Sequence, residues 1–85
     1  MCDLRPMELR DTIDMMNSED YKERFKAEYY QTKIRYEKLH AMIVKYEART
    51  LAFEPKCKIE LLRHQASMMG QYLYDLEVRA QIEDI

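Results

Sequence analysis

The side chains that could perform nucleophilic or metal chemistry are few and widely spaced in this sequence. Nucleophilic catalysis needs a serine or cysteine beside a base, and the candidates are Ser18, Ser67 and Cys57, with His40 and His64 as the imidazoles. Ser18 suits the start of a helix, and Ser67 falls in the middle of one. The cysteine and the two histidines do not converge into a ligand set for zinc. The sequence therefore predicts a protein that is not an enzyme and that needs no metal or cofactor.

Gly70 is the single glycine among the 85 residues, and it falls inside a long helical segment. A glycine at such a position costs about 1 kcal/mol relative to alanine. One interpretation is close packing of two helices at this point. The other is a notch for a ligand, opposite Lys33, rimmed by His40 and Arg63 and with Tyr36 nearby. Cationic groups beside an aromatic ring are suited to a phosphate or a nucleotide, so these five residues form the first candidate binding site.

A second candidate binding line follows the other flank of the same helical segment. Gln65, Tyr72 and Arg79 are spaced by seven residues, and Arg35 is adjacent on the neighbouring helix. Residues seven apart lie on one side of a helix. These side chains therefore offer a second row of polar and aromatic groups to a ligand.

The elements that must position these residues are helices. One glycine and two prolines are few against average usage of about 7% and 5%, which favours few, long helices. We expect helices at about residues 7–16, 19–48 and 58–83. The first carries an apolar stripe of Leu9, Ile13 and Met16 and has Pro6 before its first turn. Ser18 is the expected N-cap of the second.

Two apolar seams indicate how the long helices pack. One seam is Phe25, Tyr29, Thr32, Tyr36, Leu39, Ile43 and Tyr46, and the other is Ile59, Leu62, Ala66, Met69, Leu73, Leu76 and Ala80. Both advance by alternating steps of three and four residues, as in coiled coils. They fit each other as an antiparallel pair when facing residue numbers sum to 105. The predicted fold is all-α, a single domain over residues 1–85 with a short N-terminal helix and a long antiparallel, coiled-coil-like hairpin.

Apolar side chains also remain outside these seams. They are Tyr30 and Ile34 on the second helix and Leu61, Met68, Tyr74, Val78 and Ile82 on the third. An apolar face beyond the intramolecular seam is typical of a partner surface. The simplest partner is another copy of the chain, in a dimer or a higher oligomer that completes a helical bundle.

Charge and composition argue against several other partners. The net charge is −2, although the segment from residue 21 to 63 is basic, and binding of nucleic acid usually needs a basic surplus. No apolar run approaches the roughly 20 residues of a membrane span. The two cysteines, Cys2 and Cys57, form no spacing motif, which disfavours a disulfide framework and indicates a reducing compartment.

A resemblance adds a biological context. Residues 61–79 spell LLxxQxxxMxxYxxxLxxR, and Tyr36-Glu37-Lys38-Leu39 precedes them. From about Lys33 to Ile85 the chain resembles a family of small bacteriophage proteins named for their similarity to a gene product of crAss-like phages. The family pattern often has a proline where Lys58 stands here. The resemblance implies a helical fold and a location in the cytoplasm of an infected bacterial cell. It implies no mechanism.

Three hypotheses for the function follow from a phage context. The first is a counter-defence binding protein, which either sequesters a nucleotide second messenger or inhibits a host defence protein. The second is a structural or assembly protein that self-associates through its tyrosines and methionines. The third is a regulator that binds nucleic acid, against which stand the net charge and the lack of a helix-turn-helix pattern.

Overall fold

The computed structural model describes residues 7–85, and within this range the chain is all-helical, as predicted. The elements in chain order are η1 (Leu9–Thr12), a short 3-10 helix, then α1 (Ile13–Met16), α2 (Tyr21–Glu47) and α3 (Ile59–Glu83). Two residues named in the sequence analysis, Cys2 and Pro6, lie outside the described range. None of the described helices combines the length and the apolar composition that crossing a membrane requires.

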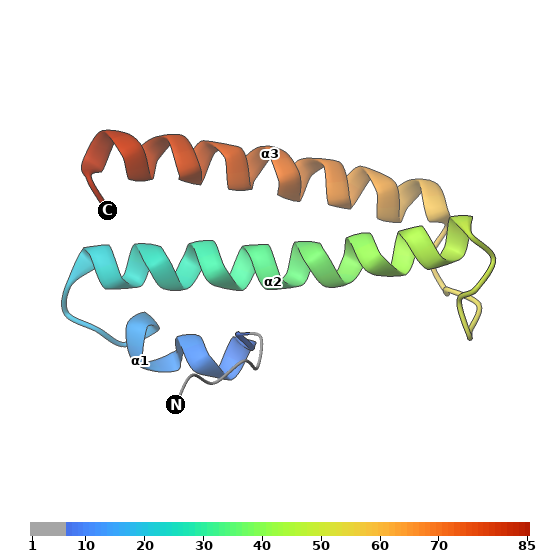
Figure 1. Cartoon of the computed structure of the whole chain (residues 1–85), viewed down its shortest axis with the longest axis horizontal. Coiled ribbons are helices and arrows are strands. Elements are labelled where there is room, and N and C mark those ends of the chain that lie inside the picture. Colours follow the sequence, from blue (N-terminus) through green and yellow to red (C-terminus); the bar gives the residue numbers. More distant parts are fainter. Residues whose placement is uncertain (1–6) are drawn as a thin grey trace, which may run out of the picture.

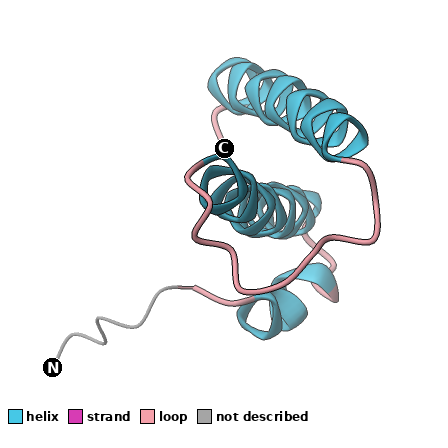
Figure 2. Ribbon diagram, turned by 90° about the vertical axis from the view of Figure 1, so that its right-hand side faces the viewer, coloured by secondary structure: helices cyan, strands magenta, loops and turns pink. Residues whose placement is uncertain are grey.

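The helices stack in three layers with α2 in the middle (Figures 1 and 2). On one side α3 runs antiparallel to α2, and on the other side η1 and α1 contact α2 near its N-terminal half. No such contact joins α1 or η1 to α3. The outward side of α3 is therefore left without a covering element.

The predicted seams form the contact between α2 and α3. Every one of their residues is buried or half-buried, and the deepest are Phe25, Leu73 and Leu76, the last with only 1% of its surface exposed. The cross-helix hydrogen bond from Tyr29 Oη to Glu77 Oε2, at 2.8 Å, joins residues whose numbers sum to 106. The register is therefore the predicted one to within a residue.

The fully buried core lies at the open end of the hairpin, where α1 adds the third layer. Near the connector the seam residues of both helices are only half-buried, because no third element covers this half of the hairpin. The radius of gyration is 15.3 Å, against about 12 Å for a compact domain of this length. One chain alone therefore has a thin, elongated core.

The N-cap of α2 differs from the prediction. Asp20, not Ser18, takes this position, and its carboxylate accepts a hydrogen bond of 3.0 Å from the backbone N–H of Lys22. Ser18 Oγ accepts from the N–H of Asp20 at 3.1 Å and so fixes the turn that precedes the cap. Serine and aspartate can both cap a helix. Because Asp20 is the cap here, α2 begins at Tyr21 and not at residue 19.

The N-terminal helix is present, but the prediction of its buried side was wrong. Ile13 and Met16 are each nearly half exposed, whereas Thr12 is fully buried. The Thr12 hydroxyl donates to the carbonyl of Leu9 at 2.7 Å and accepts from the Gln31 amide at 2.9 Å. The first turns form a 3-10 helix with three residues per turn, which rotates the buried side away from the one that an α-helical period predicts.

Candidate functional site

The predicted notch at Gly70 is occupied by a ring of the same chain. A Cβ built on Gly70 would lie 3.5 Å from Cε1 of Tyr36. The Tyr36 ring stacks in turn on the His40 imidazole, with centroids 5.9 Å apart and planes inclined by 16°. The structure thus brings Gly70, Tyr36 and His40 together, whereas Arg63 forms an ion pair with Glu47. The Tyr36 ring packs beside Gly70, and binding of a ligand at this point stays a prediction.

The second candidate line is engaged within the chain at two of its members. Tyr72 donates a hydrogen bond to the carboxylate of Glu28. Arg79 Nε lies 3.0 Å from Glu83 Oε2, and its guanidinium carbon lies 4.8 Å from the centroid of the Phe25 ring. Arg35 and Gln65, the other two residues of the line, are exposed. Any role of this row in binding stays a prediction.

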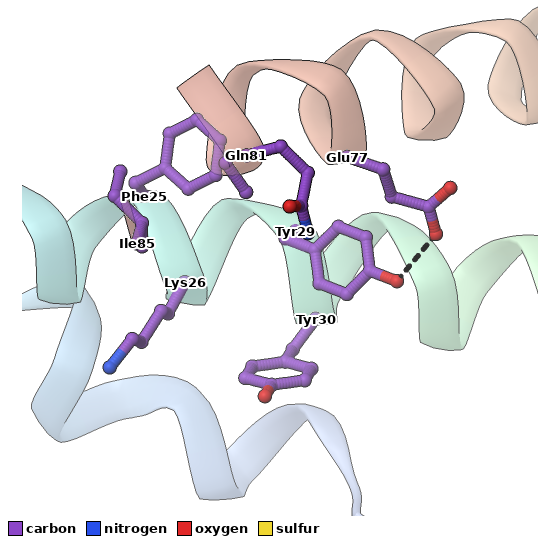
Figure 3. Close-up of a pocket in the computed structure, with 8 residues that line it drawn as sticks. Phe25, Lys26, Tyr29, Tyr30, Glu77, Gln81 and Ile85 are labelled. Carbon is purple, nitrogen blue, oxygen red and sulfur yellow. Dashed lines mark hydrogen bonds between the residues drawn. The ribbon is translucent and has the colours of Figure 1, made fainter. Parts of the chain in front are cut away.

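Another hollow lies between α2 and the last turns of α3 (Figure 3). Its volume is about 230 Å³. The residues around it combine three aromatic rings with three polar side chains, and the C-terminal Ile85 closes one end; they are Phe25, Lys26, Tyr29, Tyr30, Glu77, Gln81 and Ile85. A hollow with apolar walls and a few convergent polar groups is typical of small-molecule sites. We call this hollow the aromatic pocket.

Tyr29 is the centre of the aromatic pocket. Its ring meets that of Tyr30 edge to face, with centroids 5.4 Å apart and an angle of 66° between the planes. Its hydroxyl donates to Glu77 (Figure 3). Desolvation, followed by the hydrogen bond and the charge of Glu77, raises the pKa of Tyr29 to about 12. Burial and the contact with Glu77 thus both favour the protonated, neutral hydroxyl of Tyr29.

Two lysines supply positive charge on the same side of α2. Lys26 lines the aromatic pocket, and its ammonium lies 3.5 Å from Glu23 in an exposed pair. Lys33 follows one heptad later, with its Nζ 5.8 Å from the centroid of the Tyr29 ring. Lys33 also lines an adjacent hollow of about 240 Å³, formed with Met7, Tyr30, Ile34 and Glu37. Tyr30 borders both hollows and separates them.

This grouping can do two things chemically. Tyrosine faces can stack on a flat ring of a ligand, and such stacking contributes about 1–3 kcal/mol per nucleobase in proteins that bind single strands. Ammonium groups can neutralise an anion such as a phosphate. Stacking and charge pairing are both modes of binding.

The sequence analysis assigned these residues to other roles. It placed Tyr29 in the seam and Tyr30 and Ile34 in an oligomer interface, and it used Lys33 for the notch at Gly70. Tyr30 and Ile34 are half-buried here. The signal that could have identified the pocket is the spacing Lys26, Tyr29, Tyr30 and Lys33, which places two cations one heptad apart around a tyrosine pair.

The described residues thus define a class of protein, a helical hairpin that carries an aromatic and cationic pocket. The chain matches the model of the Sequestin family over residues 19–82 and belongs to that family, a family of small phage-type proteins. Its name suggests a sequestering, binding role rather than catalysis. This match begins at residue 19, whereas the resemblance described in the sequence analysis begins at about Lys33. The link to crAss-like phages stays a prediction. No curated protein and no solved structure matched the chain.

Proposed function

We propose that this protein binds and withholds a small anionic ligand that contains a flat ring, of the nucleotide second-messenger type, and so counters a defence system of the infected bacterium. The observation that carries the proposal is the grouping of Lys26 with Tyr29 and Tyr30 around the aromatic pocket, with Lys33 near the Tyr29 ring and in the adjacent hollow. The family name, which suggests sequestration, supports the same conclusion.

The pocket suits such a ligand in both of its parts. The tyrosine pair offers a ring face and a ring edge at a fixed angle of 66°, so a base can stack without ordering a flexible side chain. Lys26 stands at the border of this hollow and Lys33 at that of the adjacent one, where an anionic group of a seated ligand would remain near water. Because neither ammonium is buried, charge pairing there does not carry the large desolvation cost of a buried ion.

Titration calorimetry and native mass spectrometry with cyclic nucleotides and ADP-ribose derivatives test this function. We expect Tyr30→Ala and Lys33→Ala each to weaken binding by at least about tenfold, which corresponds to about 1.4 kcal/mol. Lys38→Ala is the matched control, because Lys38 is an exposed lysine on α2 at a helical angle well away from Lys26 and Lys33. Its affinity should equal that of the parent protein.

The same titrations separate the aromatic pocket from the notch at Gly70. Arg63→Ala and His40→Ala should leave the affinity unchanged if the ligand occupies the aromatic pocket. Loss of binding in these variants, with Tyr30→Ala and Lys26→Ala unaffected, would instead assign the ligand to the notch, and Lys33→Ala does not separate the two sites because Lys33 was predicted at the notch as well. A folded protein that binds none of these compounds would contradict the proposal and would favour inhibition of a host defence protein, for which capture from host lysate is the next measurement.

A further inference from the structure

The outward side of α3 carries a second heptad seam that nothing in the described chain covers (Figure 1). Its residues advance by alternating steps of three and four; they are Leu61, His64, Met68, Gln71, Asp75, Val78 and Ile82. The four apolar members are 57%, 45%, 39% and 78% exposed in chain order. A helix with apolar seams on two opposite sides is typical of a helix that packs between two partners. We call this row the outer seam.

The exposed surface of the chain is larger than that of a compact monomer. The chain exposes 6855 Å², whereas a compact monomer of its 10.4 kDa mass exposes roughly 5,400 Å². This excess belongs to the elongated chain as a whole, and the outer seam contributes to it. The exposed apolar side chains of the outer seam extend along α3 from Leu61 to Ile82, which is about 30 Å of helix.

The polar residues of the outer seam identify the occupant and its direction. A parallel copy would place Asp75 against Asp75 and His64 against His64, and two facing aspartates are destabilising because their charges repel each other. An antiparallel copy in which facing residue numbers sum to 139 pairs Leu61 with Val78, His64 with Asp75, and Met68 with Gln71. Each imidazole then meets a carboxylate, twice per pair because of the twofold symmetry.

We propose that α3 pairs with α3 of a second copy, antiparallel and in this register, so that the protein is a homodimer joined along the outer seam. The neighbouring register, with a sum of 146, places His64 against Ile82 and Asp75 against Gln71 and leaves the imidazole and the carboxylate without each other. The complementary pair His64 and Asp75 therefore selects one register.

Disulfide trapping tests the direction and the register together. Leu61→Cys and Val78→Cys are made separately in a chain whose Cys2 and Cys57 are replaced by serine, and the two proteins are oxidised alone and mixed. We expect disulfides only in the mixture, because in the antiparallel dimer two copies of either position lie 17 residues apart along the helix, about 25 Å. Self-linked Leu61→Cys and Val78→Cys would establish a parallel pair and overturn the proposal. A mixture without cross-links, from folded proteins, would overturn the α3 interface itself.

A charge exchange provides a second, independent test by sedimentation equilibrium. His64→Asp should weaken the dimer at least tenfold, because it places Asp against Asp at two symmetric points. The double variant with His64→Asp and Asp75→His restores the pairing in reversed order and should restore the dimer. Ala52→Asp, at an exposed position in the connector, is the control for added negative charge. Equal association of all four proteins would contradict the proposal, as would a parent protein that sediments as a monomer.

Discussion

The ring of Tyr36 on α2 lies against Gly70 on α3, with 3.5 Å between Cε1 and the point where a Cβ of residue 70 would stand. This distance is an ordinary van der Waals contact, so the site would admit one methyl group but no larger side chain without moving the ring. The glycine therefore allows the Tyr36 ring to lie between the two helices. The stack of Tyr36 on His40 holds the ring in this place.

The contact predicts that Gly70→Ala stabilises the protein. A glycine inside a helix is less stable than alanine by about 0.5–1 kcal/mol, and the added methyl meets only the side chain of Tyr36. We expect the free energy of unfolding to rise by about this amount in urea denaturation followed by circular dichroism. Gly70→Leu should lower it, because the larger side chain displaces the ring. A destabilised Gly70→Ala protein would contradict this prediction.

The long hairpin could be predicted from the sequence because its seams have the period of an α-helix. The three-and-four spacing from Phe25 to Tyr46 and from Ile59 to Ala80 fixes which side each helix buries. Together with the matching lengths, it also fixes the register. The N-terminal helix could not be predicted in the same way. Four residues of 3-10 helix at Leu9–Thr12 change the period, and the buried residue becomes Thr12, whose hydroxyl donates to the carbonyl of Leu9.

The aromatic pocket escaped prediction because it depends on where α3 ends. Glu77, Gln81 and Ile85 complete the pocket from the last turns of the chain, and no local pattern in the sequence joins them to Tyr30. The notch at Gly70 was inferred from one unusual residue, without knowledge of the Tyr36 rotamer. That rotamer decides whether the space is open or filled.

The raised pKa of Tyr29 predicts a pH dependence of stability in the alkaline range. Tyrosine in an unfolded chain loses its proton near pH 10, whereas folded Tyr29 retains it up to about pH 12. Its contribution is therefore fully present below pH 10 and is lost as the pH rises from 10 toward 12. Tyr29→Phe should remove this part of the alkaline decline. Stability profiles from pH 8 to pH 12 that coincide for the two proteins would contradict the assignment.

The same pKa can be observed directly by tyrosinate absorption. The other six of the seven tyrosines give the background absorption. Tyr29→Phe should remove the rise in tyrosinate absorption near pH 12. Glu77→Gln should move that rise toward pH 10, because it removes the carboxylate whose hydrogen bond and charge favour the protonated hydroxyl. The shift should be incomplete, since desolvation of Tyr29, the largest cause, remains in the variant.

The end of α2 contains a strained residue whose replacement should stabilise the chain. Arg49 has a left-handed backbone with φ of 61°, and the N–H groups of Arg49 and Thr50 donate to the carbonyls of Tyr46 and Lys45. This hydrogen-bond pattern favours glycine at the left-handed position. We expect Arg49→Gly to raise the free energy of unfolding by about 1 kcal/mol. Arg49→Ala, which removes the charge and keeps the Cβ, should give no comparable gain.

The uneven core predicts that equivalent leucines of α3 contribute unequally to stability. Leu76 has 1% of its surface exposed, beneath the three-layer end, whereas Leu62 is half-buried near the connector. Leu76→Ala should cost about 2–5 kcal/mol, because it removes buried apolar surface and leaves a cavity. Leu62→Ala should cost less than half of that, since its site is already partly open to water. Urea denaturation at one fixed protein concentration measures both losses of stability. Equal losses would show that a second chain buries the half of the hairpin near the connector.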